Sequence, residues 1–321
     1  MQIFANTNYN FLRWRWHAIV LSLVVIGAGV VKIAMDGLPL GIDFSGGTSL
    51  VVQGAKEDDV RRAMDSIAGE KVIQQYDDPS KGQVLIRLPQ AGDGSEGNLE
   101  RQAQQIEGAL TAAGLKTTIV SRELVGPVIG ADLQRRGIYA TLASILAITV
   151  YIAFRFRPSF AIGAIAATFH DVFVTLAFLT FFGYDLSLNV VAALLTITGY
   201  SVNDTIVIFD RVRENLRSMR RQPLEEVVNL SVNQTLSRTI ITAGATFLSV
   251  LALFVFGGEA LRGFAFTMLV GIVSGTYSTI FIASAIAIIL SQGRRRTAAA
   301  AEPPSTTAQD KGRKPRRARA S

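Results

Sequence analysis

Six apolar runs, each long enough to cross a lipid bilayer, constrain this 321-residue chain more than any other feature of its sequence. A spanning helix needs about 20 mainly apolar residues to cross the hydrocarbon core of a membrane. The runs cover residues 18–35, 137–154, 160–182, 186–209, 239–258 and 263–293. We therefore predict a polytopic α-helical membrane protein with six transmembrane helices.

The first run has an alternative reading as a cleaved signal peptide, because Arg13 and Arg15 precede it. The run is longer than the roughly 7 to 15 residues of a signal-peptide core. No Ala-x-Ala cleavage pattern follows it, and Trp14 and Trp16 fit the aromatic belt of a membrane interface. The sequence therefore favours a retained first helix.

The last run, residues 263–293, is longer than one perpendicular crossing requires. We expect it to tilt, to kink at Gly271 or Gly275, or to leave the bilayer before its end. With Ser278, these glycines form a face of small residues whose spacing allows two helices to approach closely. The sequence assigns this face to helix packing rather than to transport.

Arginines in the short loops predict the orientation, because cytoplasmic loops are enriched in Lys and Arg. Arg155 and Arg157 lie between the second and third runs, and five arginines lie within 211–221 between the fourth and fifth. The short loops on the opposite side, 183–185 and 257–262, hold one basic residue between them. We expect residues 1–17 and 294–321 in the cytoplasm and residues 36–136 outside.

The C-terminal tail, residues 294–321, carries the charge imbalance of the chain. Its nine Lys and Arg against two acidic residues give a surplus of seven, equal to the net charge of +7 for the whole protein. The tail lacks apolar periodicity, so we predict a disordered segment attracted to anionic lipid. Contact with ribosomal RNA is an alternative, and no specific nucleic-acid site is expected.

Residues 36–136 have the pattern of a folded domain outside the membrane. Apolar periodicity predicts strands at 48–53, 71–76, 83–88 and 116–125, and helices at 57–68 and from Asn98 to Gly114. The order β-α-β-β-α-β is that of a ferredoxin-like α+β domain, with two helices on one face of an antiparallel sheet. This segment contains no His or Cys, so we expect no catalytic residue, metal or cofactor there, and no enzyme activity.

Charged residues inside the spans are the candidates for function, since an aspartate there costs roughly 2.5 to 3.5 kcal/mol on insertion scales. Asp204 lies about 27 Å into the fourth run, and Arg238 begins the fifth run at the same side. An ion pair between them would be broken by protonation of Asp204. His170 and Asp171, about 18 Å into the third run, would extend a path for protons. Two simpler roles stay open: Arg238 as an interfacial anchor, and His170 with Asp171 as packing residues.

Residues 41–48, Gly-Ile-Asp-Phe-Ser-Gly-Gly-Thr, join the first run to the outer domain. Three glycines permit backbone conformations that other residues resist, which predicts a turn. A phosphate-binding loop is not predicted, because neither a Lys nor a helix start follows. The segment resembles the signature of the SecD/SecF family of bacterial protein export, with matching positions at Gly41, Asp43, Phe44, Gly46 and Gly47.

Four later segments are similar to the SecF members of that family. They are residues 125–130, residues 169–171 with His170 and Asp171, residues 199–211 with Tyr200, Asn203, Asp204 and Asp210, and residues 231–239 with Arg238. The matches occur in the family's order from the first run to the sixth.

The resemblance implies a subunit of the bacterial cytoplasmic membrane that pairs with SecD in a twelve-helix assembly similar to resistance-nodulation-division transporters. It implies association with the SecYEG translocon and use of the proton motive force to draw exported polypeptides across the membrane. It also implies that Asp204 and Arg238 take part in proton movement.

Two other classes of protein share parts of this pattern. One is half of a proton-antiport exporter of small molecules or lipids, which would have the same charged spans. The other is an intramembrane aspartyl protease using Asp171 and Asp204. The usual Tyr-Asp and Gly-x-Gly-Asp settings are absent, since Tyr184-Asp185 falls in a loop and Asp204 follows Val-Asn. The sequence therefore disfavours proteolysis.

Overall fold

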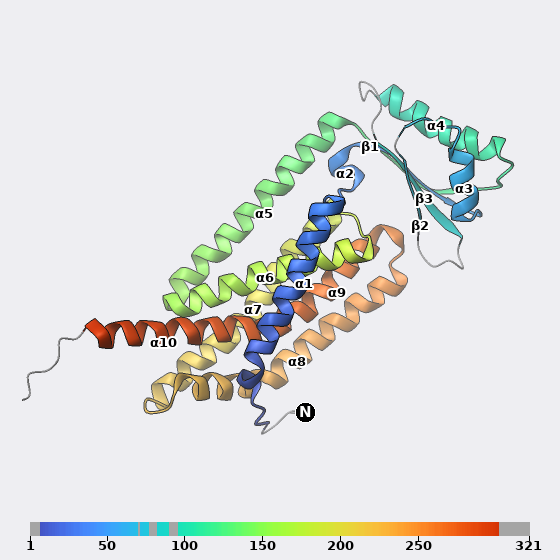
Figure 1. Cartoon of the computed structure of the whole chain (residues 1–321). Helices are drawn as coiled ribbons and strands as arrows, with labels where there is room; N and C mark the ends of the chain where they lie inside the picture. The colour runs from blue at the N-terminus through green and yellow to red at the C-terminus, as the bar shows by residue number, and fades with distance from the viewer. Residues whose placement is uncertain (1–6, 70, 77–81, 90–95, 302–321) are drawn as a thin grey trace, which may run out of the picture.

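The structure, a computed structural model, describes residues 7–69, 71–76, 82–89 and 96–301. Figure 1 shows a bundle of long helices with a small α/β domain at one end, which we call the domain end of the bundle. Within the described residues, six helical segments are long and apolar enough to cross a membrane: Phe11–Asp36, Val128–Arg155, Pro158–Phe182, Leu188–Ser218, Leu224–Phe256 and Leu261–Gln292. The predicted polytopic fold is confirmed.

The bundle helices extend beyond the apolar runs at several ends. They are α1 (Arg15–Asp36), α5 (Pro127–Arg155), α6 (Pro158–Phe182), α7 (Leu188–Ser218), α8 (Leu224–Phe256), α9 (Glu259–Ser278) and α10 (Ser284–Ala301). Proline in the first turn favours the early starts of α5 and α6, because its missing N–H is not needed there. The Ser187 side chain caps α7 by accepting from the Val190 N–H.

The last apolar run is interrupted, but not at Gly271 or Gly275. Residues Thr279–Ala283 form a π-helical turn between α9 and α10, and Figure 1 shows α10 leaving the direction of α9 there. The two glycines instead let α9 approach α7, since a Cβ at Gly275 would lie 2.9 Å from the Cβ of Ser201. Helix α10 continues to Ala301, past the expected start of the tail at 294, because Arg and Ala favour helix. The expected disorder and lipid contact of residues 302–321 lie outside the described residues.

The α/β domain has the predicted order of strands and helices. Its elements are β1 (Gly47–Gln53), α3 (Glu57–Met64), β2 (Val72–Gln75), β3 (Gln83–Leu88), α4 (Glu96–Ala112) and β4 (Thr118–Val125). Within the described residues the strands lie in the order β2-β3-β1-β4 and all neighbours are antiparallel, which confirms the ferredoxin-like arrangement. Asn98, expected at the helix start, lies inside α4, because the helix begins at Glu96.

The domain core lies between the two helices and one face of the sheet. Leu50 of β1, Ile86 of β3, Val60 of α3 and Ile106 of α4 are all fully buried in it. The other face of the sheet is turned toward the domain end of the bundle, where β1, β3 and β4 line a shared cleft with the α6–α7 loop.

The core predicts the effect of a buried charge. In the isolated segment 46–125, Ile106→Asp should cost at least about 3 kcal/mol of unfolding free energy, because an unpaired carboxylate would enter an apolar core. Ile119→Asp is the matched control, since Ile119 is 41% exposed on β4 and its replacement should cost under about 1 kcal/mol. Urea unfolding followed by circular dichroism measures both, and equal losses would remove Ile106 from the core.

Candidate functional site

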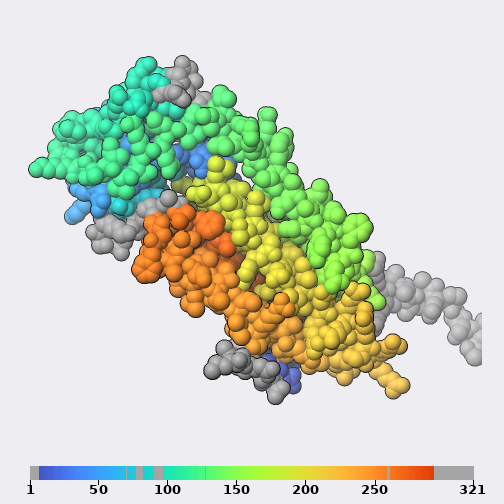
Figure 2. Space-filling model, turned by 180° about the vertical axis from the view of Figure 1, so that it is seen from behind, coloured from blue at the N-terminus to red at the C-terminus, as the bar shows by residue number. Residues whose placement is uncertain are grey.

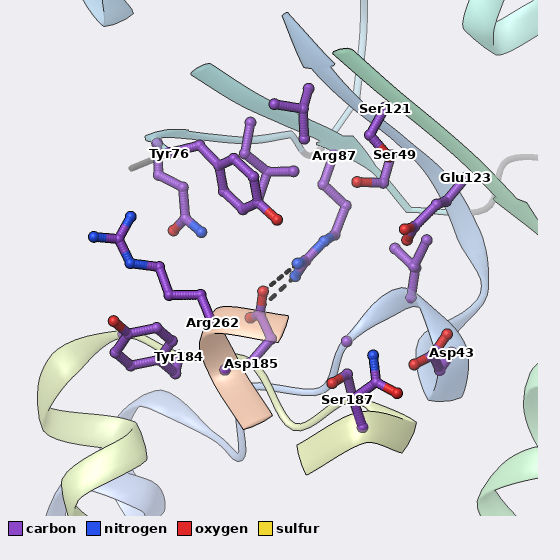
Figure 3. A pocket seen from close by; sticks show the side chains of 18 of the residues that line it. Asp43, Ser49, Tyr76, Arg87, Ser121, Glu123, Tyr184, Asp185, Ser187 and Arg262 are labelled. Carbon is purple, nitrogen blue, oxygen red and sulfur yellow. Dashed lines mark hydrogen bonds and ion pairs between the residues drawn. The ribbon is translucent and has the colours of Figure 1, made fainter. Parts of the chain in front are cut away.

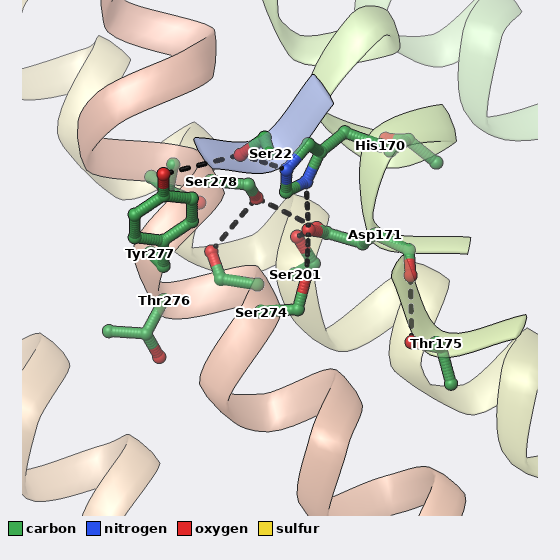
Figure 4. Close-up of polar contacts among 12 residues, drawn as sticks. Ser22, His170, Asp171, Thr175, Ser201, Ser274, Thr276, Tyr277 and Ser278 are labelled. Atoms are coloured by element: carbon green, nitrogen blue, oxygen red, sulfur yellow. Dashed lines mark hydrogen bonds and ion pairs between the residues drawn. The ribbon is translucent and has the colours of Figure 1, made fainter. Parts of the chain in front are cut away.

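Asp171 of α6 is buried at the meeting point of three bundle helices (Figure 4). Its Oδ2 accepts from the Ser201 hydroxyl of α7 at 2.5 Å and from Ser278 of α9 at 2.8 Å. Its Oδ1 accepts from Ser274 of α9 at 2.8 Å and lies 3.0 Å from Nδ1 of His170. Four contacts from described residues fill the acceptor capacity of a carboxylate. To take a proton, Asp171 would have to lose one of these contacts or reverse its direction.

Local sequence explains how these groups converge. Ser274 and Ser278 are one turn apart on α9, so both hydroxyls face the same carboxylate. Gly275 lies between them and brings α9 against Ser201 of α7. Sequence reasoning assigned this face, Ser278 included, to helix packing and did not predict that its serines donate to Asp171. The sequence signal for this role was the alternation of these serines with glycine in a span that could pack near an intramembrane aspartate.

His170 connects this cluster to α1. Its Nε2 lies 2.8 Å from the Ser22 hydroxyl, and its ring stacks on Tyr277 with centroids 6.0 Å apart. The Ser22 hydroxyl lies 3.2 Å from the Tyr277 oxygen, and Tyr277 donates to the backbone carbonyl of Ala18 at 2.6 Å. A continuous hydrogen-bonded chain therefore runs from Asp171 through α6 and α9 to the first helix.

Asp204 has a different environment from Asp171. It is buried on α7, about 24 Å from the start of that helix at Leu188. Its Oδ2 has no hydrogen-bond partner among the described residues. The side chain lies one turn beyond Ser201, so the Asp171 cluster fixes the part of α7 that carries it. This buried oxygen has a free acceptor position for a proton.

Arg238 does not form the expected ion pair with Asp204 in the structure. Its side chain is exposed on α8, whereas Asp204 is buried, and no salt bridge within the described residues joins them. The ion pair between Asp204 and Arg238 stays a prediction.

Three candidate residues remain on α7: Tyr200, Asn203 and Asp210. Asn203 is exposed and Tyr200 is half-buried. Asp210 pairs with Arg155 at 2.7 Å and so ties α7 to α5. Figure 2 shows α7 (yellow) reaching the surface between α5 (green) and the orange helices α8 and α9.

The glycine motif at 41–48 is a joint between α1, the domain and two other bundle helices. Residues Ile42–Ser45 form the short helix α2, rather than only a turn, and Gly46 and Gly47 follow with φ of 69° and 125°. The Gly41 N–H donates to the Leu186 carbonyl at 2.8 Å, and the Asp43 carboxylate accepts from the Leu188 N–H at the start of α7, also at 2.8 Å.

The same motif also holds the start of α5. A Cβ at Gly130 would lie 3.3 Å from the Gly46 nitrogen, and one at Gly137 would lie 3.6 Å from the Phe44 ring. The approach at Gly130 is tight, so a side chain there would require a shift of a few tenths of an ångström, whereas the distance at Gly137 is an ordinary van der Waals contact. The motif residues therefore position three helix ends around the entry to the domain.

A cleft of about 760 Å³ separates the open face of the sheet from the bundle (Figure 3). Arg87 of β3 forms a two-pronged ion pair across it with Asp185 of the α6–α7 loop. Partial burial raises the pKa of Glu123 in the cleft wall, and the carboxylate of Asp43 raises it further. The ion pair and the glycine joint together fix the domain to the same end of α7.

A multi-pass membrane protein with a ferredoxin-like domain and buried carboxylates is the class that this fold and site define. The family "Protein export membrane protein SecD/SecF, C-terminal" matches residues 105–293, and "SecD/SecF GG Motif" matches residues 33–57. The chain belongs to the SecD/SecF family of protein-export membrane proteins.

Curated relatives match over nearly the whole chain. The protein translocase subunit SecF of Rhodothermus marinus is 43% identical, over 90% of this chain and 96% of its own length. That of Escherichia coli O157:H7 is 38% identical, over 89% of each chain.

Two solved structures are also similar. The SecDF crystal structure from Thermus thermophilus, a translocon-associated membrane protein, matches with a TM-score of 0.79 and 35% identity over 91% of this chain. SecDF in its super-membrane-facing form matches with a TM-score of 0.68 and 35% identity over 92% of this chain. In both cases this chain spans 40% of the SecDF chain.

The serine cluster predicts a stability effect. Replacing Ser274 and Ser278 together by Ala should lower the thermal midpoint of the purified protein in detergent, because each lost bond between membrane helices is worth about 0.6 to 1.7 kcal/mol. Ser249→Ala is the control, since Ser249 is exposed on α8 and donates within its own helix. Equal midpoints for the two variants would mean that the cluster does not hold the helices together.

Proposed function

We propose that this chain is the SecF subunit of a SecD-SecF auxiliary of the Sec translocase, located in the bacterial cytoplasmic membrane with both termini in the cytoplasm. The observation that carries the proposal is the similarity to SecF proteins over about nine-tenths of the chain. In this assembly the subunit associates with SecYEG and uses the proton motive force to promote export of polypeptides. The arginine distribution supports the orientation, which places the ferredoxin-like domain outside.

A polar stripe on the bundle surface supports pairing with a second membrane protein. Asn203 and Thr196 of α7 and Arg238 and Thr242 of α8 are exposed on the surface of the bundle. Polar side chains are costly in lipid and are enriched where helices associate. The match to one part of the longer SecDF chain makes SecD the partner that would cover this stripe.

Asp204 is the group that we assign to the proton step. It is buried one turn from the fixed Ser201, and its Oδ2 has a free acceptor position, whereas Asp171 is saturated with donors. A proton on Oδ2 removes the charge of Asp204 and its attraction to Arg238. Moving one charge through 100 mV is worth about 2.3 kcal/mol, enough to shift a two-state equilibrium.

The two alternatives from the sequence gain less support. A small-molecule antiporter would share the buried carboxylates, but the relatives that match over this length carry the name of a protein translocase subunit. A protease would place two aspartates together on one water, whereas all four contacts of Asp171 go to serine and histidine side chains within the described residues. We propose that the chain is not an enzyme.

Asp204→Asn tests the function, because the amide keeps the size of the side chain and cannot carry the proton. We expect the variant to assemble with SecD and to lose the part of polypeptide translocation that an uncoupler abolishes in wild-type membrane vesicles. Asp132→Asn, at an exposed ion pair of α5, should keep that part. Arg238→Lys should keep some of it, because the charge remains but the planar fork of Arg is lost. Full gradient-dependent stimulation in Asp204→Asn at matched protein levels would contradict the proton step.

A further inference from the structure

The hydroxyl of Ser22 has one proton and two neighbouring acceptors. His170 Nε2 lies 2.8 Å from its oxygen, and the Tyr277 oxygen lies 3.2 Å away. Tyr277 gives its own proton to the Ala18 carbonyl, so toward Ser22 it acts as an acceptor. Ser22 therefore donates either to the imidazole or to the tyrosine, and the charge of the imidazole decides which.

The other side of the imidazole has a fixed role. Nδ1 faces an Asp171 oxygen that already accepts from Ser274, and a carboxylate oxygen accepts but does not donate. Nδ1 therefore carries a hydrogen in both states of the ring. The second nitrogen, Nε2, is the variable one.

The hydrogen bonds from His170 through Ser22 to Tyr277 differ between the two protonation states of His170. With a neutral ring, Ser22 donates to Nε2 and the Tyr277 oxygen receives no proton from it. With a protonated ring, Nε2–H donates to Ser22, Ser22 donates to Tyr277, and every contact in the chain has one donor and one acceptor. The cation also neutralises the charge of Asp171 beside it, so the pair adds no net charge to the membrane interior.

We propose that His170 is a proton-holding group whose protonation at Nε2 reverses the Ser22 hydroxyl and binds α1 more tightly to α6 and α9. Ser22 and Tyr277 are its positioning residues. This inference rests on the proposed proton-driven function and extends it to the first helix.

Helix α1 connects the Ser22–His170 contact with the α/β domain. It leads directly into the joint at Gly41–Gly47, which is bonded to the start of α7 and continues as β1. The groups facing the His170 ring come from three helices: Asp171 of α6, Ser22 of α1 and Tyr277 of α9. Within the described residues, Asp171 is the charged side chain in contact with the ring.

The chain has two histidines, so His17→Gln leaves His170 as the single imidazole for ¹⁵N NMR of the full protein in lipid nanodiscs. We expect Nδ1 to carry hydrogen throughout, and Nε2 to gain a proton as the pH is lowered. Tyr277→Phe removes the acceptor for Ser22 and should move the midpoint down by about 0.5 to 1 pH unit, the equivalent of one hydrogen bond. Tyr139→Phe, exposed on α5, should leave it unchanged.

Ser22→Ala provides a second test that does not alter the aromatic ring, and it should lower the midpoint in the same direction. An Nδ1 without hydrogen, an Nε2 that gains no proton as the pH is lowered, or an unchanged midpoint in both variants would overturn the proposal. The measurement needs neither translocon nor gradient. Failure of the Asp204 experiment can therefore be distinguished from failure here, and failure here would leave the export function standing.

Discussion

The hydrogen bonds of one buried carboxylate, Asp171, determine how the centre of the bundle is arranged. An ionisable group at this depth is tolerated only with partners, and three serine hydroxyls from two other helices provide them. Because these donors come from α7 and α9, the carboxylate fixes both helices relative to α6. Asp204 and His170 owe their positions to it, the first through Ser201 and the second through direct contact.

Helix α7 is held at two levels, and this connects the membrane interior with the domain. In the bundle, Ser201 donates to Asp171. At the domain end, Asp43 accepts from the N–H at the start of the helix, and Gly41 donates to the Leu186 carbonyl in the loop before it. Arg87 of the sheet forms an ion pair with Asp185 in the same loop. A shift of α7 that follows a change of charge at Asp204 would therefore act on the domain through side chains that are already bonded to it.

The fold was predictable because it depends on local sequence patterns. The site was only partly predictable, because it depends on contacts between helices. Apolar run lengths and strand periodicity gave the six spans and the ferredoxin-like order because both depend on neighbouring residues. The π-turn at Thr279–Ala283 and the role of Ser274 were not predictable, since both depend on how α9 packs against α6 and α7. Sequence reasoning named Asp171, His170 and Asp204 as candidates, but the different environments of Asp171 and Asp204 required the structure.

The central claim is that Asp204 takes the proton while Asp171 stays a fixed anion. Infrared difference spectroscopy of the full protein in lipid, between high and low pH, detects the carbonyl stretch of a newly protonated carboxyl group. The account predicts a band that disappears in Asp204→Asn and remains in Asp171→Asn. A band that remains in Asp204→Asn and disappears in Asp171→Asn would reverse the assignment and contradict the account.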